Sequence, residues 1–295
     1  MALSLASALG WYWYTHGQAA EGRACIVDLI AQSVELDPPT RARALHSLGV
    51  LEQQQGDNDR AIVDLEAALG IWRAHGDRLG IAKALNSLGT TRWAIGDYDG
   101  ARALLEESAA IATETGDDER RAAALSNLGL VAMSVGQPDL ACERFSDALA
   151  IDERRQDGWA LLVDECNLAT ALALLGRLDE ARRHLGNIAD NVRELGDADL
   201  LVSTLEGLAI VANESGDIWR CVALMTGVDT IRTAAGIPRT QADESFLRRV
   251  LVTTSEPLTE AEHERAVRLG ASFNMSELVA FALADAGDST SDQNS

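Results

Sequence analysis

Aromatic residues, prolines, cysteines and positive charges are all scarce in this sequence of 295 residues. Aromatic residues make up only 4%, while hydrophobic residues reach 47% and are mostly alanine and leucine, a composition suited to closely packed helices. The five prolines lie outside the periodic segments described below, as expected if they begin or end helices. No run approaches the roughly 18 apolar residues of a membrane-spanning helix. We therefore predict a protein without membrane segments.

The residues that usually carry chemistry form no recognisable set. The four cysteines have no CxxC spacing, which favours reduced, buried thiols in a cytoplasmic protein over disulfides or a zinc site. No two of the five histidines are four residues apart, and HExxH, GxSxG and GxGxxG are absent. The apolar N-terminal segment has no positive stretch before it and matches the repeat register, which argues against a signal peptide. We predict no metal, no cofactor and no enzymatic activity.

Positive charge is low relative to negative charge. The sequence has 25 lysines and arginines against 46 aspartates and glutamates, a formal net charge of −21. Such a chain repels phosphate, so nucleic acids and anionic membranes are poor partners. The charge favours solubility and partners that are not acidic.

A unit of 40 residues recurs along the chain. Each copy carries a Leu-Gly or Leu-Ala pair and a second glycine seven residues later. The pairs begin at Leu48, Leu88, Leu128, Leu168 and Leu208, and the second glycines are Gly56, Gly96, Gly136, Gly176 and Gly216. Leu9-Gly10 and Gly17 mark a further copy, shorter by one residue. A fixed period of this length is typical of a repeat architecture.

Each copy has the pattern of two helices. In the third copy, the spacing of apolar residues predicts a first helix over 81–95 and a second over 98–114. Gly96-Asp97 lies between them, where glycine suits a left-handed helix end and aspartate suits the next N-cap. Gly89 and Ala101 recur in other copies as small residues, which indicates that the two helices cross closely.

The motif within each copy resembles the tetratricopeptide repeat. In the fourth copy the matching positions are Leu125, Leu128, Gly129, Gly136, Ala141, Phe145 and Ala148. The period is 40 residues rather than the usual 34. The resemblance covers about residues 3–236 and implies an all-α, right-handed superhelical solenoid of antiparallel helix pairs.

We expect six repeats followed by a helical cap. The repeats should cover about 1–40, 41–80, 81–120, 121–160, 161–200 and 201–236. Residues 237–285 depart from the period and should form helices near 241–253, 259–269 and 276–284 that cover the last repeat. Residues 286–295 have the composition of a disordered tail.

Two segments outside the repeat motif resemble a narrower family. WYWYTHGQAAEGR near the start and AVRLGASFNMSELVAFALADA near the end are similar to the C-terminal helical region of actinobacterial ATP-dependent transcriptional regulators of the LuxR-type and cyclase-fused class. The resemblance implies a sensor or autoinhibitory arm of a signalling regulator. The sequence has neither the GxxxxGK[ST] loop nor the basic helix-turn-helix of such regulators.

The first helices of stacked repeats should line a concave groove that binds a protein or peptide. The resemblance to tetratricopeptide proteins implies that asparagines at the position before the Leu-Gly or Leu-Ala pair hold a peptide backbone, because an amide both donates and accepts hydrogen bonds. Asn127 and Asn167 match this position, whereas three of the other copies have serine or glycine there. Glu206 should lie near this groove. The predicted groove residues are His46, Lys83, Asn86, Thr90, Trp93, Asn127, Leu130, Met133, Asn167 and Thr170. Two alternatives stay open: the asparagines satisfy neighbouring helices or water, and Trp93 belongs to the core.

Four consecutive aromatic residues stand at 11–14. A single helix cannot bury all four, so Trp11 and Tyr14 should face the groove or solvent and form an interdomain or oligomer patch. The alternative is that the second helix of the same repeat covers them. The leading hypothesis is therefore a non-catalytic protein-interaction scaffold. Two alternatives are an arm that senses a small-molecule inducer and a module for structural homo-oligomerisation through the aromatic end.

Overall fold

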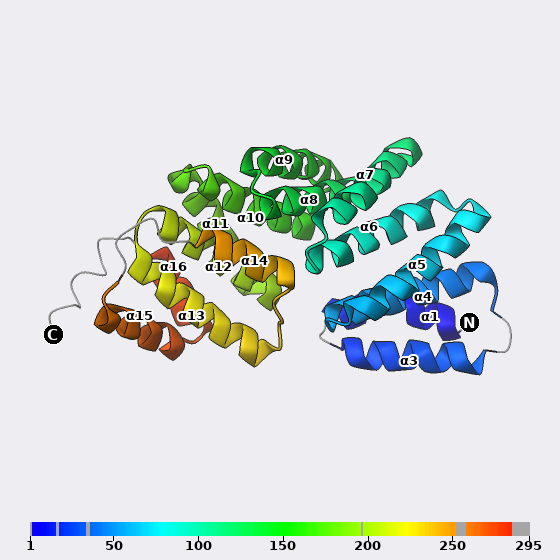
Figure 1. The fold of residues 1–295 in the computed structure, drawn as a ribbon, viewed down its shortest axis with the longest axis horizontal. Helices are drawn as coiled ribbons and strands as arrows, with labels where there is room; N and C mark the ends of the chain where they lie inside the picture. Colours follow the sequence, from blue (N-terminus) through cyan, green and yellow to red (C-terminus); the bar gives the residue numbers. More distant parts are fainter. Residues whose placement is uncertain (1, 16–17, 34–35, 196, 252–257, 285–295) are drawn as a thin grey trace. The chain divides into compact units, whose positions relative to one another are not determined.

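The computed structural model describes residues 2–15, 18–33, 36–195, 197–251 and 258–284. The described residues are all-helical, without strands, and successive helices pair in the manner of a repeat solenoid (Figure 1). Their bounds are α1 Ala2–Ala8, α2 Gly10–Thr15, α3 Ala19–Gln32, α4 Pro38–Gln54, α5 Asn58–His75, α6 Arg78–Ala94, α7 Tyr98–Thr115, α8 Asp118–Ser134, α9 Pro138–Arg155, α10 Gly158–Leu174, α11 Leu178–Leu195, α12 Ala198–Glu214, α13 Ile218–Ala235, α14 Gln241–Val250, α15 Glu260–Ser272 and α16 Met275–Leu283.

The helices keep the register of the sequence repeat. The first helices α4, α6, α8, α10 and α12 begin at residues 38, 78, 118, 158 and 198. The second helices α5, α7, α9, α11 and α13 begin at 58, 98, 138, 178 and 218. The first helix of the third copy thus starts at Arg78, three residues before the predicted position, because the Asp77 side chain accepts from the Gly80 backbone N–H at 3.0 Å and caps it there.

The Gly-Asp pairs end one helix and begin the next. Gly76 ends α5 in the left-handed region at φ 66°, and Asp97 caps α7 by accepting from the Gly100 backbone N–H at 3.0 Å. Gln156 takes the place of glycine at the end of α9 and also adopts a positive φ, 56°. A side chain in this region is strained relative to glycine.

The recurring helix glycines allow two helices to cross closely. A Cβ added to Gly49 would lie 2.7 Å from Leu65 Cγ, and one added to Gly89 would lie 2.6 Å from Leu105 Cγ. Both leucines belong to the second helix of the same repeat and are fully buried. The small residues therefore have the packing role that their spacing indicated.

The described residues group into two compact units. The N-terminal unit contains residues 1–135, 150–155 and 240–243, and the C-terminal unit contains 136–149, 156–239 and 244–295. In the first repeat the first helix is divided at Leu9 into α1 and α2. Within the C-terminal unit, α15 and α16 pack on α13, with Leu278 and Val279 fully buried. Among the described helices none is long and apolar enough to cross a membrane.

Candidate functional site

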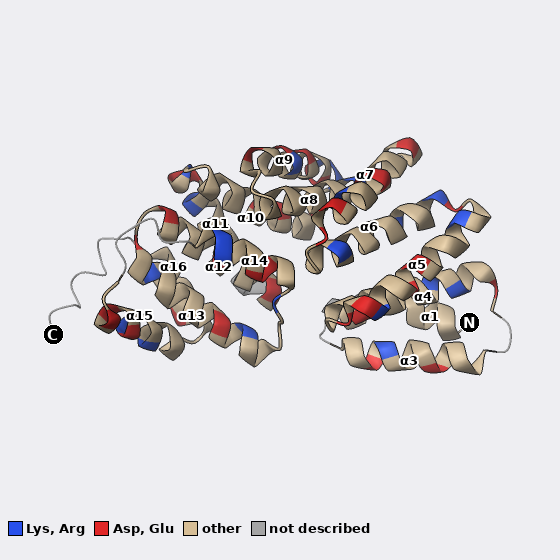
Figure 2. Cartoon of the chain, in the orientation of Figure 1, with Lys and Arg blue, Asp and Glu red and all other residues tan. Residues whose placement is uncertain are grey.

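The first helices of the N-terminal unit present a row of side chains that we call the candidate face. It consists of residues on α6 and α8 that follow one another at steps of three or four positions and so lie on one side of each helix. Its members on α6 are Asn86, Thr90 and Trp93, and those on α8 are Asn127, Leu130 and Met133. Charged side chains of both signs are scattered over the helices of this unit (Figure 2).

His46 lies inside the protein. It is 4% exposed, its Nε2 is 3.0 Å from Ser87 Oγ on the neighbouring first helix, and its ring centroid is 5.7 Å from that of Trp72. Burial, together with the positive charge of Lys83, lowers the pKa of His46 to about 3, so the ring is neutral. His46 therefore joins α4 to α6 and is covered from a ligand.

Two asparagines form a direct amide pair between neighbouring first helices. Asn127 Nδ2 donates to Asn86 Oδ1 at 3.0 Å, and both residues are half-buried. Among the described residues no other side chain hydrogen-bonds Asn86 Nδ2 or Asn127 Oδ1. Each amide thus keeps one polar atom, the Asn86 Nδ2 donor or the Asn127 Oδ1 acceptor, without a side-chain partner among the described residues. The alternative that neighbouring helices satisfy the asparagines thus holds for Asn86 Oδ1 and Asn127 Nδ2, which bond to each other.

Further along α6, polar side chains again bridge the first helices. Thr90 Oγ1 donates to the Ser87 carbonyl at 2.9 Å and accepts from Gln53 Nε2 at 3.2 Å. Trp93 Nε1 donates to Ser134 Oγ at 2.8 Å, which fixes the plane of the indole. Trp93 is half-buried and packs against the core residues of the N-terminal unit. It therefore belongs partly to the core and keeps an exposed edge.

The other predicted groove residues of this unit differ in exposure. Leu130 is half-buried, and Met133 is only 6% exposed. Lys83 is exposed and is the only lysine of the chain. Partial burial and the positive charge of Arg120 lower the pKa of Lys83. Lys83 and Leu130 are thus accessible, and Met133 contributes mainly to packing.

In the C-terminal unit α14 covers the α12 part of the equivalent face. Asn213 on α12 is 7% exposed, and its Nδ2 donates to the Val250 carbonyl at the end of α14 at 3.1 Å. Leu247 of α14 joins the buried cluster of this unit, and Phe246 packs against it. Thr170 is buried and its Oγ1 donates to the Cys166 carbonyl at 3.0 Å, while Asn167 is half-buried.

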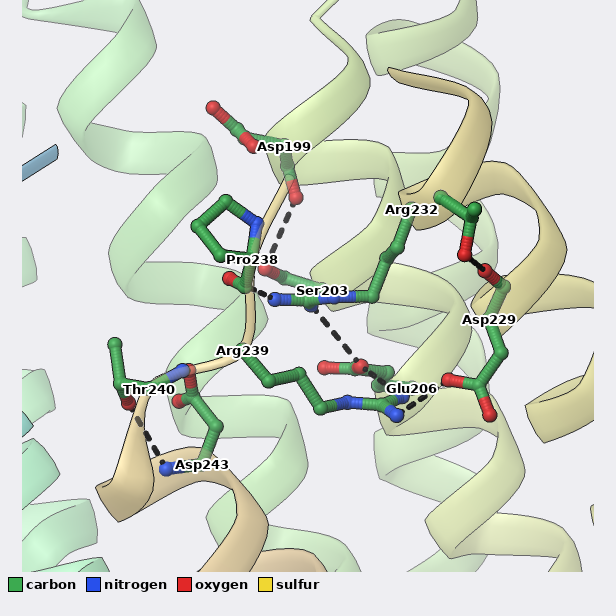
Figure 3. Close-up of polar contacts among 10 residues, drawn as sticks. Asp199, Ser203, Glu206, Asp229, Arg232, Pro238, Arg239, Thr240 and Asp243 are labelled. Atoms are coloured by element: carbon green, nitrogen blue, oxygen red, sulfur yellow. Dashed lines mark hydrogen bonds and ion pairs between the residues drawn. The ribbon is translucent and has the colours of Figure 1, made fainter. Parts of the chain in front are cut away.

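Glu206 anchors a charged network beside this face (Figure 3). Its Oε1 accepts from Arg232 Nη1 at 3.2 Å and from Arg239 Nη2 at 3.0 Å. Arg239 also pairs with Asp229, and Arg232 Nη2 donates to the Pro238 carbonyl at 2.8 Å. The network ties α12 and α13 to the segment that leads into α14. Arg239 lies outside the repeat period, so no spacing in the sequence pointed to it.

The predicted aromatic patch has a different composition in the structure. Tyr14 is half-buried and packs against the core of the first repeat, and its carbonyl accepts from Gln54 Nε2 at 2.6 Å. Tyr14 thus contributes to this core rather than to a surface patch. The Trp11 side chain lies outside the described residues. Tyr12, which the sequence analysis did not single out, is 47% exposed.

The part of the chain that the structure describes holds no cluster of three or more potential metal ligands. Its most unusual acidic group is Glu52, which is 2% exposed and accepts from Arg23 Nε at 3.2 Å. Burial raises the pKa of Glu52 to about 7, against the hydrogen bond from Arg23, and the neighbouring charge of Asp64 raises it further. This group lies between α3, α4 and α5, away from the candidate face residues Asn86 and Asn127.

Comparison with known proteins identifies the repeat. A tetratricopeptide repeat family model matches residues 40–114, and a second one matches residues 166–187. These two stretches match the tetratricopeptide repeat. No curated protein matches its sequence.

Solved structures share the fold at low sequence identity. The repeats of a putative kinesin light chain from Podosopora anserina have a TM-score of 0.51 and 22% identity, over 68% of this chain and 99% of theirs. The Rap conjugation gene regulator of plasmid pLS20, in complex with the Phr* peptide, has a TM-score of 0.61 and 15% identity, over 90% and 74%. Aspartyl phosphate phosphatase F from Bacillus subtilis has a TM-score of 0.58 and 14% identity, over 85% of this chain and 71% of its own. At these identities the likeness shows a tetratricopeptide-like helical solenoid.

Proposed function

We propose that the chain is a non-catalytic interaction module that binds a peptide segment of a partner protein on the candidate face of its N-terminal unit. The observation that carries the proposal is the Asn86–Asn127 amide pair. The pair keeps one donor and one acceptor for a ligand, and the C=O and N–H groups of a peptide backbone can bond to them. The fixed, half-buried Trp93 ring supplies a rigid apolar contact seven residues along α6 from Asn86.

The two units differ in how available this face is. In the C-terminal unit, α14 covers Asn213 and Thr170 is buried, so of the predicted groove residues there only Asn167 is half-buried. In the N-terminal unit, Asn86, Thr90 and Asn127 are each half-buried, so a peptide can reach them. This difference favours the N-terminal unit as the binding surface.

The test starts from selection of random peptides displayed on phage against the whole chain. Binding of the enriched peptide is then measured by fluorescence anisotropy for the parent and the Asn86→Ala, Asn127→Ala double variant. We expect at least about a tenfold loss of affinity, because two backbone hydrogen bonds are removed. The matched control is Asn187→Ala, Asn191→Ala on exposed positions of α11, which should bind as the parent does. Equal binding by both double variants would contradict the proposal.

We further propose a regulatory setting for this interaction: the sensor or regulatory region of a bacterial transcriptional or signalling regulator, acting in the cytoplasm. The two terminal motifs that resemble actinobacterial regulators support this setting. A fold neighbour that is itself a gene regulator in complex with a peptide is consistent with it. In this organisation, six repeats over 1–236 carry the binding surface and residues 237–285 form a cap.

A cavity supports a second candidate function, the sensing of a small molecule. It has a volume of about 300 Å³ and lies among α5, α6 and α7. Leu69, Leu88 and Leu104 line it, together with Glu66, Arg73 and Arg92. Arg92 pairs with Glu66 and Arg73 pairs with Glu107, so the apolar part of the lining is what a ligand would contact. Small, mainly apolar molecules match this lining, and the volume lies at the lower end of the range for ligand sites, about 300–1,000 Å³. A thermal-shift screen with such molecules tests it, and no shift with any of them counts against it.

A further inference from the structure

Three side chains on α12 occupy the register positions that the candidate face has on α6. On α6 these positions, three repeats earlier, hold Asn86, Thr90 and Trp93, and on α12 they hold Glu206, Ile210 and Asn213. We call these three α12 residues the α12 face. The three α6 residues are all half-buried, whereas Ile210 is 1% and Asn213 is 7% exposed. The α12 face is thus covered, although it has the register of an accessible one.

The cover is the chain segment 239–250, which includes α14. At its start, Arg239 Nη2 donates to Glu206 Oε1 at 3.0 Å (Figure 3). At its end, the Val250 carbonyl accepts from Asn213 Nδ2 at 3.1 Å. The two contacts join the two ends of the segment to the two ends of the α12 face, so the segment runs in the same direction as α12. A helix of this chain therefore lies where a helix of another protein could bind.

The α14 helix has the pattern of a segment that binds in a groove. Its inward side holds Phe246, Leu247 and Val250, which pack with the same buried cluster as the apolar residues of α12. Its outward side holds Glu244 and Arg248, which are exposed. Apolar residues three and four positions apart are the means by which an amphipathic helix binds in an apolar groove of a partner.

The other two helices of the cap are attached in a different way. α15 and α16 pack on α13, where a Cβ added to Gly227 would lie 2.6 Å from Leu278 Cδ1. The glycine of α12, Gly207, instead has Leu185 and Thr170 as its nearest neighbours. α14 thus lies over side chains of α12 and not over a glycine. It can leave α12 without opening a close helix crossing, while α15 and α16 still cover α13.

The charges at the start of the segment indicate which partner fits. Glu206 and Asp229 both pair with Arg239, and Glu206 also pairs with Arg232. Without Arg239 these two carboxylates have one cation fewer, in a chain whose formal net charge is −21. A segment with a basic residue at this place restores the lost pairs, whereas an acidic segment is repelled.

We propose that the α12 face is a second interaction surface, that residues 239–250 are its built-in occupant, and that an amphipathic helix of a partner protein displaces them. The partner helix has apolar residues at the spacing of Phe246, Leu247 and Val250, preceded by a basic residue at the place of Arg239. Because the occupant belongs to the same chain, it lowers the apparent affinity for the partner by the fraction of molecules in which the face is covered. The α12 face belongs to the C-terminal unit and the Asn86–Asn127 pair to the N-terminal unit, so each surface is tested by its own variants.

The probe is a fluorescently labelled synthetic peptide with the sequence of residues 237–251, IPRTQADESFLRRVL. Its binding to the whole chain is measured by fluorescence anisotropy. The variant Arg239→Glu, Leu247→Asp weakens the built-in occupant and leaves α12 unchanged, so it should bind the peptide at least about tenfold more tightly than the parent does. The matched control is Ser245→Asp, Arg248→Glu, which changes the net charge by the same amount on the exposed side of α14 and should bind as the parent does.

A third substitution locates the bound peptide. Asn213→Ala, added to the Arg239→Glu, Leu247→Asp variant, removes the hydrogen bond to the end of the peptide and should weaken binding about fivefold. Circular dichroism checks that the variants keep their helices. If the double variant does not, Arg239→Ala alone keeps the buried Leu247 and should still strengthen peptide binding about fivefold over the parent.

Two results overturn the proposal. One is a folded variant with a weakened occupant that binds the peptide no better than the parent does, which would make α14 a fixed part of the fold. The other is equal binding with and without Asn213→Ala, which would place the peptide away from the α12 face.

Discussion

The same substitution, glycine to alanine, should have opposite effects at two helix positions of the N-terminal unit. Gly70 lies in α5 and Gly89 lies in α6, and both are inside their helices. Alanine in a helix interior is favoured over glycine by about 0.5–1 kcal/mol. The space around the new Cβ decides whether this gain is kept.

At Gly70 an added Cβ would meet nothing within 4 Å. We therefore expect Gly70→Ala to raise the free energy of unfolding by about 0.5–1 kcal/mol. At Gly89 the Cβ would lie 2.6 Å from Leu105 Cγ and 2.8 Å from Leu105 Cδ2. Leu105 is fully buried, so it has little room to move, and overpacking of this kind costs about 1–3 kcal/mol. Gly89→Ala should therefore lower stability by up to about 2 kcal/mol.

The assay is urea unfolding, monitored by circular dichroism. The slope of the unfolding free energy against urea concentration is compared among the variants, because a repeat array can unfold in more than one step. The parent lies between the two variants if the reasoning is correct. Equal stabilisation by both substitutions would refute it, because the close helix crossing at Gly89 would then carry no energetic consequence.

Three further predictions concern the backbone and two buried groups. Because the pKa of Glu52 is raised from 4.5 to about 7, its contribution to stability is complete below pH 4.5 and lost as the pH rises through about 7. The free energy of unfolding from urea titrations should be about 1–3 kcal/mol higher at pH 5 than at pH 8 for the parent. The difference should be much smaller for Glu52→Gln, and an unchanged difference would contradict the assignment. Gln156→Gly should raise the free energy of unfolding by about 0.5–1 kcal/mol, because glycine tolerates φ 56°. This gain is measured as a higher thermal midpoint. A lower midpoint would show that the glutamine side chain stabilises the fold by more than the backbone strain costs. Burial raises the pKa of the Cys166 thiol to about 12, so a thiol reagent at pH 8 should label Cys166 only after unfolding, whereas the half-buried Cys25 reacts in the folded chain; mass spectrometry of the labelled peptides decides.

The repeat register and the helix ends could be predicted because they depend on neighbouring residues. Gly96 and Asp97 define a helix end and an N-cap within a few positions, and the structure has both. The close crossing at Gly89 also followed from its recurrence. The fold class was therefore accessible from the sequence.

The candidate site was only partly accessible, because it depends on side chains from different repeats. The repeat period placed Asn127 at the position before the Leu-Gly pair and Asn86 near the same groove, but it did not predict the hydrogen bond between them. It did not predict that His46 is buried, with a hydrogen bond to Ser87 and a ring contact with Trp72. The cover of α14 over α12 rests on a contact between Asn213 and a segment outside the period, which no spacing rule describes.

Because the helix ends recur at the same spacing in successive repeats, one repeat can be removed as a unit. Gly76 and Gly116 end their helices with φ of 66° and 68°, and Asp77 and Asp117 cap the helices that follow. An in-frame deletion that joins Gly76 to Asp117 thus preserves a glycine terminator followed by an aspartate cap. Duplication of the same stretch has the same property. The array can gain or lose length by whole modules, each of which adds or removes one first helix while every helix junction stays chemically the same.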